Sequence, residues 1–154
     1  MYQKILIPLD GSKIGEAALS YVEDMVSKLS PEVKVEITLL QVLPPIHPSS
    51  IGGRQIPDIA FTVKESGETE KEAIDYLNKF GEALRSKGAT VKAKVAIGDA
   101  SEEIINAAEE TNTNLIAMST HGRSGLSRWA FGSVTDKVLR RGGMIPIVMV
   151  KAPG

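Results

Sequence analysis

The chain alternates between short apolar runs and stretches in which apolar residues recur every three or four positions. Lys4 to Leu9 is almost continuously apolar, which is typical of a strand covered on both faces. From Ile14 to Leu29 the apolar residues follow helical spacing, and Pro31 stops the pattern. Residues 33–43 alternate at first and are then solidly apolar, so they predict a second strand.

Residues 44–60 interrupt this rhythm with four prolines and two glycines. A loop of this length in a compact domain is usually functional or disordered, so it either closes over a ligand, reaches a partner chain, or has no fixed structure. A helix follows, carrying Ile74, Leu77, Phe80 and Leu84 on one stripe and ending near Gly88.

The second half repeats the strand and helix patterns. Residues 91–97 alternate as a strand does, and Asp99 with Glu102 makes a capping-box start for a short helix. Leu115 to Met118 predicts the next strand, and a glycine-rich loop leads from it into a helix that ends at residues 140–143. The last strand is predicted from Met144 to Val150.

The order is therefore strand and helix in strict alternation, five strands and four helices. This pattern predicts an α/β fold in three layers, an open parallel sheet with helices on both faces, forming one domain over residues 1–154. In such sheets ligands bind at the carboxyl ends of the strands, where the strand order reverses. Asp10, Val42 and Met118 all fall at predicted strand ends, so we expect three distant segments to meet in one crevice.

Composition narrows the possible partners. Eighteen basic and nineteen acidic residues give a net charge of -1, so no whole-chain field favours nucleic acids or acidic membranes. The chain has no cysteine, which excludes thiolate chemistry and cysteine-ligated zinc. No apolar run approaches the roughly 18 residues of a membrane span, and Asp10 interrupts the first run too early for a signal peptide. We expect a cytoplasmic protein.

The loop of residues 118–133 combines glycine, serine and arginine between a strand and a helix. Free N–H groups and the positive end of a helix make such a loop a cradle for an anion, to which the Arg123 guanidinium and His121 would add donors. The alternative is an ordinary loop in which Ser133 caps the helix and Asp136 completes the capping box. Neither a Walker motif nor a dinucleotide fingerprint is present.

This loop resembles that of the universal stress protein family, whose ATP-binding branch carries Gly-x2-Gly-x9-Gly-Ser/Thr. Gly122 and, nine residues later, Gly132-Ser133 match the pattern, while Ser119 replaces the first glycine. The opening residues 5–12 and the closing residues 146–150 also resemble the family. The resemblance implies the adenine nucleotide alpha hydrolase-like fold with strand order 3-2-1-4-5.

The resemblance also implies a nucleotide site assembled from several segments. Asp10 and Val42 would contact adenine and Pro8 would shape that wall, while Met118 and Val134 would line the pocket. Ser119 and Gly122 would border the ribose and the phosphates. Gly132 and Ser133 would hold the phosphates through an amide and a hydroxyl.

Three of these residues have alternatives. Asp10 also fits a turn in which its carboxylate caps the first helix, and each oxygen can serve one role. His121 either donates to a phosphate or is a loop residue that faces solvent or bonds to the backbone. The Cβ of Ser119 either hinders backbone approach to the ligand, or its hydroxyl donates to a ribose or phosphate oxygen.

Three functions follow. The first is a regulatory, stress-response module that binds ATP, or AMP or ADP, with Mg²⁺ carried on the phosphates. The second is a slow ATP hydrolase or phosphotransferase, for which a positioned base is not evident. The third is a nucleotide-free interaction protein. The resemblance further implies a homodimer through Met144–Val150, where the last strand is a sticky edge; the alternative is a monomer shielded by Pro146 and a helix.

Overall fold

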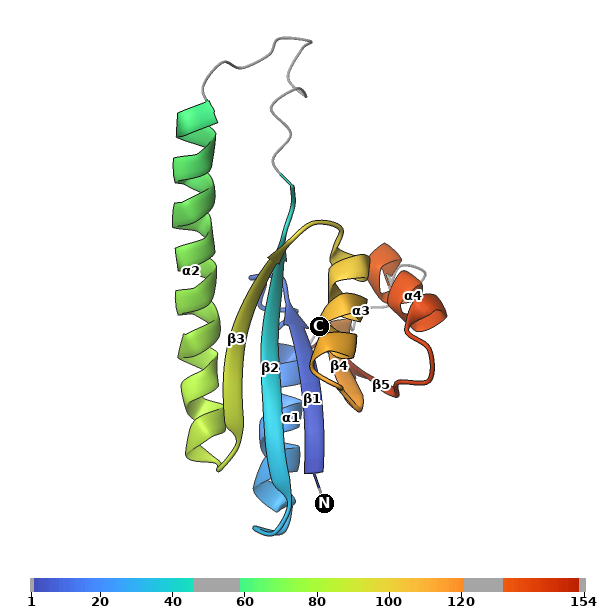
Figure 1. Cartoon of the computed structure of the whole chain (residues 1–154). Helices are drawn as coiled ribbons and strands as arrows, with labels where there is room; N and C mark the ends of the chain where they lie inside the picture. The colour runs from blue at the N-terminus through green and yellow to red at the C-terminus, as the bar shows by residue number, and fades with distance from the viewer. Residues whose placement is uncertain (1, 46–58, 121–131, 153–154) are drawn as a thin grey trace.

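The computed structural model describes residues 2–45, 59–120 and 132–152, and it contains a five-stranded parallel sheet (Figure 1). The strand order is β3-β2-β1-β4-β5, which confirms the predicted topology. The strands are β1 (Tyr2–Leu9), β2 (Lys34–Leu43), β3 (Thr90–Ile97), β4 (Leu115–Thr120) and β5 (Ile147–Lys151). All four pairings are parallel, so the carboxyl ends of the strands share one edge.

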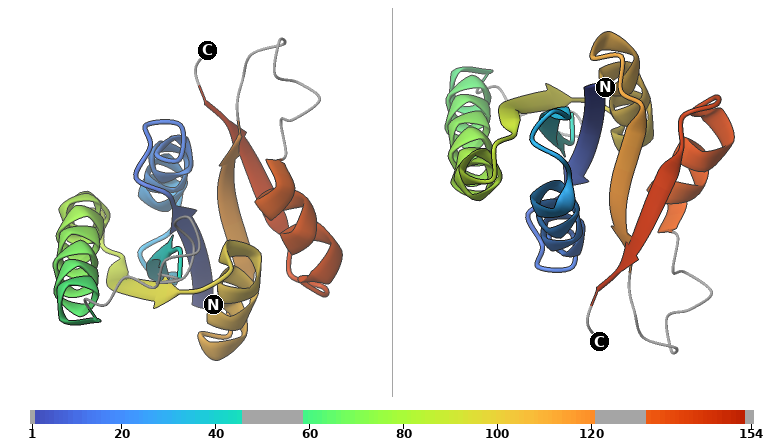
Figure 2. Two further views of the ribbon diagram at one scale, coloured as in Figure 1. Left: turned by 90° about the horizontal axis from the view of Figure 1, so that it is seen from above. Right: turned by 90° about the horizontal axis from the view of Figure 1, so that it is seen from below.

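Within the described ranges, four helices connect the strands and cover both faces of the sheet (Figure 2). They are α1 (Ala17–Lys28), α2 (Ile59–Ser86), α3 (Ala100–Glu110) and α4 (Gly132–Arg141). One hydrophobic core joins α1 and α2 to side chains of β1 and β2 such as Ile7 and Ile37. A second, smaller core joins α3 and α4 to the opposite side of the same strands, including Leu6 and Leu40. Alternate residues of each strand therefore serve different cores, as expected for a sheet buried on both faces.

The helix α1 begins later than its apolar spacing predicts. Residues 13–16 form turns closed by bonds three residues back, such as Glu16 N to Lys13 O at 3.2 Å, and the helix proper begins at Ala17. No side chain of its own segment caps it, because Glu16 at the N-cap position makes no side-chain bond. The cap comes instead from Ser119, whose Oγ accepts a hydrogen bond from Ala18 N at 2.8 Å.

Three other boundaries differ from the sequence prediction. The strand β5 begins at Ile147 rather than Met144, because Pro146 has no N–H to donate to the sheet and Met144 is 98% exposed. β4 continues to Thr120, two residues past the predicted end. α2 begins at Ile59, inside the predicted loop of residues 44–60; residues 46–58 of that loop lie outside the described part of the chain.

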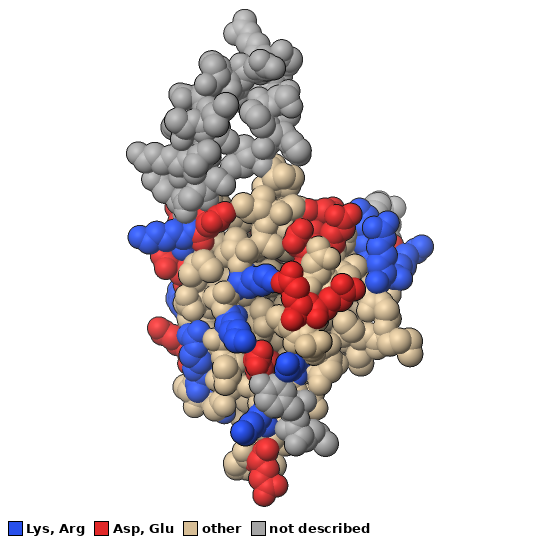
Figure 3. All heavy atoms as spheres, in the orientation of Figure 1, with Lys and Arg blue, Asp and Glu red and all other residues tan. Residues whose placement is uncertain are grey.

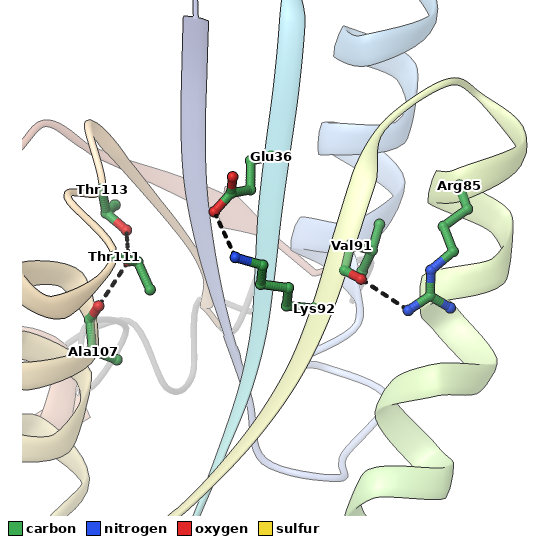
Figure 4. Close-up of polar contacts among 7 residues, drawn as sticks. All are labelled: Glu36, Arg85, Val91, Lys92, Ala107, Thr111 and Thr113. Atoms are coloured by element: carbon green, nitrogen blue, oxygen red, sulfur yellow. Dashed lines mark hydrogen bonds and ion pairs between the residues drawn. The ribbon is translucent and has the colours of Figure 1, made fainter.

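Polar contacts fasten the outer parts of the fold to the sheet (Figure 4). The Arg85 guanidinium of α2 donates to Val91 O at 2.9 Å, and Lys92 Nζ lies 3.4 Å from Glu36 Oε1 across the β2–β3 pair. At the far end of α3, the Thr111 hydroxyl donates to Ala107 O at 2.7 Å. The first contact ties α2 to β3, the second links β2 to β3, and the third closes the C-terminal turn of α3.

Candidate functional site

A hollow of about 190 Å³ lies at the carboxyl edge of the sheet. Its walls come from the ends of β1, β2 and β4, from α3 and α4, and from the turn before α1. The strand order reverses between β1 and β4, so the hollow occupies the place where open α/β sheets bind ligands. The lining residues are Pro8, Leu9, Asp10, Gly15, Leu40, Val42, Ala100, Ile104, Met118, Ser119, Val134 and Thr135.

Six of the residues predicted from the sequence line this one hollow. They are Pro8, Asp10, Val42, Met118, Ser119 and Val134, and they come from four separate segments of the chain. Gly132 and Ser133 form the start of α4, next to Val134. His121, Gly122 and Arg123 lie outside the described residues.

The start of α4 bears on the alternative reading of the glycine-rich loop. Ser133 lies inside the helix rather than before it, and the Asp136 carboxylate pairs with Arg140 Nε at 3.1 Å. The side chain of Ser133 lies outside the described part of the chain, so the capping box of Ser133 and Asp136 stays a prediction. Ser133 is the second residue of α4, so its N–H is one of the first in the helix. The first N–H groups of a helix have no hydrogen-bond partner within it.

The remaining lining residues were not predicted. Ala100 and Ile104 stand on the first turns of α3, and Leu9 and Leu40 lie near the ends of their strands. The sequence marks each of them only as core, because an apolar residue on a helix stripe or in a strand has the same signature whether it packs against protein or faces a ligand. Together they make the hollow mainly apolar, which suits a flat ring more than a charged group.

Asp10 forms the predicted turn with Gly11 and Ser12, but its carboxylate bonds to Ser12 and does not cap α1, which begins at Ala17. Its Oδ1 accepts hydrogen bonds from Ser12 N at 2.9 Å and from Ser12 Oγ at 2.5 Å, which closes a turn through Gly11 at φ +86. Within the described part of the chain, no hydrogen bond reaches Oδ2. The carboxylate is exposed and lines the hollow, so one oxygen fixes the turn while the other remains able to accept a bond from a ligand.

Gly15 allows the carboxylate to lie in this position. A Cβ on Gly15 would lie 2.8 Å from Asp10 Oδ1, closer than real Cβ contacts come. Its N–H also donates to Ser12 Oγ at 3.1 Å, which ties the residue into the same turn. The sequence shows Gly15 in the run Asp10-Gly-Ser-Lys-Ile-Gly15. A second glycine after a turn is too common to predict that the residue lines a ligand site.

The hydroxyl of Ser119 is used by the protein itself. It donates to Gly15 O at 2.8 Å and accepts from Ala18 N at the same distance. A serine hydroxyl has one proton, so the expected donation from Ser119 to a ribose or phosphate oxygen is replaced by donation to the turn before α1. Ser119 still contributes to the wall of the hollow.

Tyr76 of α2 is the one titratable side chain near the site whose pKa is strongly shifted within the described residues. Burial, and after it the negative charges of Glu16 and Asp10, raise the pKa of its hydroxyl to about 12. The hydroxyl is buried and has no hydrogen-bond partner among the residues that the structure describes. Tyr76 therefore stays a neutral phenol at physiological pH and adds no charge beside Asp10.

Charge on the molecule is mixed. Figure 3 shows acidic side chains over α3 beside basic side chains over α4, with no continuous basic surface on this face. Among the described residues, no three His, Cys, Asp or Glu side chains gather as metal ligands would. Within the same residues, no helix is both long enough and apolar enough to cross a membrane.

The chain is an open α/β sheet domain with a mainly apolar hollow at the point where the strand order reverses, bordered by one carboxylate. The comparison with known proteins makes this specific, because the model of the universal stress protein family matches residues 1–151. The chain belongs to the universal stress protein family.

Individual relatives agree with this assignment. Universal stress protein MJ0577 of Methanocaldococcus jannaschii is 31% identical over 163 residues, which cover 98% of this chain and 96% of that protein. Universal stress protein MJ0531 of the same organism is 29% identical over 153 residues, or 99% of this chain and 84% of that protein. The solved structure of MJ0577 superposes with a TM-score of 0.79 at 28% identity, covering 100% of this chain and 99% of that one.

Two more distant structures carry nucleotides. A universal stress protein family protein from Arabidopsis thaliana, solved with AMP bound, has a TM-score of 0.62 at 16% identity and covers 99% of this chain and 93% of that one. A universal stress protein in complex with cAMP has a TM-score of 0.57 at 16% identity and covers 97% of both chains. At this identity the likeness of the two structures to this chain shows the fold alone.

Proposed function

We propose that this chain is a single nucleotide-binding domain that takes ATP, with AMP or ADP as related ligands, and acts as a regulatory stress-response module. The observation that carries the proposal is the convergence of Pro8, Asp10, Val42 and Met118 on one hollow from three strand ends. Chains of this family that were solved with AMP and with cAMP support an adenine nucleotide as the ligand.

The base would occupy the described hollow. Its volume of about 190 Å³ is smaller than the roughly 300–1,000 Å³ of pockets that enclose a whole small-molecule ligand, so it suits the flat ring rather than the entire nucleotide. Val42 and Met118 would pack on the ring. Asp10 Oδ2 would accept a hydrogen bond from the exocyclic amino group of adenine, because carboxylate oxygens accept and do not donate.

The phosphates would extend toward the start of α4. There the first N–H groups have no partner within the helix, and the helix dipole favours negative charge, which makes Gly132 and Ser133 the proposed phosphate contacts. Gly122, Arg123 and His121 complete this proposed set. Mg²⁺ would be held by the phosphates with mostly water ligands. We propose binding with at most slow hydrolysis, in the cytoplasm.

Isothermal titration calorimetry with Mg-ATP, Mg-ADP and AMP tests the proposal directly. We expect one site per chain with a Kd between micromolar and millimolar. Replacing Val42 with Trp would fill the hollow with an indole, so Val42→Trp is expected to abolish binding. Absence of heat and of a thermal shift at millimolar nucleotide for the unsubstituted protein would reject nucleotide binding.

A matched substitution separates loss of the site from general damage. Val33 is also half-buried, but it lies just before β2, at the amino ends of the strands, whereas Val42 lies at their carboxyl ends. Val33→Trp introduces the same side chain and is expected to leave nucleotide affinity unchanged. Equal loss of affinity in both variants would show that the effect is not local to the hollow.

We further propose that two copies associate through β5. This strand lies at the edge of the sheet, and four of its residues, Ile147 to Val150, are only partly buried within one chain. An apolar edge with unpaired backbone groups is a template for pairing with another strand. The second copy would cover it.

A further inference from the structure

The hydrogen bonds of Ser119 connect two parts of the site that are far apart in sequence. Its hydroxyl joins the end of β4 to the start of α1, 101 residues earlier, through Ala18 N. Ala18 is completely buried, so water cannot replace Ser119 as a partner for this N–H. The N–H belongs to the first turn of α1, where helices have no partner of their own. Ser119 therefore acts as the missing N-terminal cap of this helix.

The same hydroxyl continues a chain of bonds that ends at Asp10. Ser119 Oγ donates to Gly15 O at 2.8 Å, and Gly15 N donates to Ser12 Oγ at 3.1 Å. Ser12 in turn donates to Asp10 Oδ1 through both its hydroxyl and its N–H. The position of the Asp10 carboxylate thus depends on where the turn of residues 11–16 lies, and Ser119 is what holds that turn against β4.

We propose that Ser119 is a positioning residue that sets the orientation of Asp10 and, through it, the preference of the hollow for a 6-aminopurine. This rests on the proposed nucleotide binding. With Oδ1 held by Ser12, only Oδ2 faces a ligand, and it accepts a bond from an amino group and repels a carbonyl oxygen. A purine with an oxygen at position 6 therefore places that oxygen, an acceptor, against Asp10 Oδ2, which is also an acceptor.

The proposal gives the departure from the Gly-x2-Gly-x9-Gly-Ser pattern a function. A glycine at position 119 has no hydroxyl, so it leaves both Gly15 O and Ala18 N without this partner. The serine at this position in the chain replaces a flexible residue by a fixed link between β4 and α1. Returning to glycine is then expected to weaken selectivity, even though it restores the pattern.

The test compares ATP with inosine triphosphate, its 6-oxo analogue, by calorimetry. We expect the Kd of inosine triphosphate divided by the Kd of ATP to fall about five- to tenfold in both Ser119→Ala and Ser119→Gly, the size expected from the net loss of one neutral hydrogen bond. Ser119→Thr keeps the hydroxyl and is expected to keep the ratio. Asp10→Ala is expected to remove the preference, and adding Ser119→Ala to it changes the ratio no further.

The control is Thr111→Val, which removes a part-buried hydroxyl bond to Ala107 O at the other end of the sheet (Figure 4). It is expected to leave the ratio unchanged. An unchanged ratio in Ser119→Ala and Ser119→Gly, or an equal fall in Thr111→Val, would overturn the positioning role.

Amide hydrogen exchange at Ala18 provides a readout that needs no ligand. Exchange is expected to accelerate at least tenfold in Ser119→Ala and to stay slow in Ser119→Thr and Thr111→Val. Slow exchange at Ala18 in Ser119→Ala would overturn the cap and the positioning role with it. If the unsubstituted protein binds neither nucleotide, the proposed function and the selectivity fail together, while the exchange rates still decide whether Ser119 holds the turn. If it prefers ATP and Ser119→Ala keeps that preference, the positioning role alone fails.

Discussion

Replacing Gly15 with Ala changes one atom at the point where the Asp10 carboxylate meets the turn before α1. The added Cβ would lie 2.8 Å from Asp10 Oδ1 and 3.4 Å from Ser12 O. Only the first contact is impossible, because 3.4 Å is the beginning of ordinary van der Waals contact. The carboxylate must therefore retreat by several tenths of an ångström.

The retreat weakens the two bonds that Asp10 Oδ1 accepts from Ser12, now 2.9 Å and 2.5 Å. Because Asp10 is exposed, water replaces part of the loss, so we take about 1–2 kcal/mol for the pair. Alanine also restricts the unfolded chain, which stabilises the protein by about 0.4–1 kcal/mol. The net expectation is a destabilisation of about 1 kcal/mol, or roughly 2–4 °C in Tm for a domain of this size.

The decisive measurement repeats Gly15→Ala in an Asp10→Ala background. With the carboxylate gone, the clash disappears and only the effect on the unfolded chain remains. Gly15→Ala should then be neutral or stabilising by up to about 1 kcal/mol, so its sign is expected to reverse between the two backgrounds. Urea denaturation at neutral pH measures all four proteins of the cycle. An equal destabilisation in both backgrounds would refute the argument, since it would place the cost of the alanine elsewhere.

The dimer and the first turn of α3 provide two more predictions. Sedimentation equilibrium of the unsubstituted protein is expected to give twice the chain mass of 16.5 kDa. Val148→Glu puts a charge on β5 and is expected to give the mass of a single chain. A monomeric unsubstituted protein at high concentration would contradict pairing through β5. Bonds from Ser101 Oγ and then from Glu102 N hold the pKa of Asp99 below its ordinary value of 3.8. As the pH falls, Asp99 is therefore protonated in the unfolded chain before it is protonated in the folded protein. The stability that the Asp99 carboxylate contributes is full above pH 3.8 and is lost below it. The stability difference between the unsubstituted protein and Asp99→Ala, followed by urea denaturation, is expected to be constant near neutrality and to shrink in acid; a constant difference down to pH 2 would contradict this.

The sheet was predictable because each strand satisfies its own requirements locally. The continuous apolar run of β1 and the alternating pattern of β3 depend on burial of their own faces, and parallel order follows from the intervening helices. The strand ends then placed Asp10, Val42 and Met118 at one edge without any knowledge of contacts. The three residues do line one hollow, although β4 ends at Thr120, two residues later than predicted.

The start of α1 was not predictable, because its cap is Ser119, more than a hundred residues away. Local spacing carries no information about such a partner, so the pattern extended the helix back to Ile14. Ile104 and Ala100 were missed for a related reason: an apolar side chain that faces a hollow has the same sequence signature as one that faces protein. The start of β5 was predicted at Met144, three residues too early, because the apolar run continues across Pro146. Pro146 has no N–H to donate to the sheet, so the strand begins only after it.

The central position of β1 has a consequence for synthesis of the chain. β1 is made first and can pair with β2 early, but its other neighbour, β4, begins only at Leu115. Until then the sheet that can form is β3-β2-β1, and one side of β1 remains an open hydrogen-bonding edge. Pairing across so many residues is slow because a long loop must close, so a ribosome-bound chain retains this exposed edge through most of its translation.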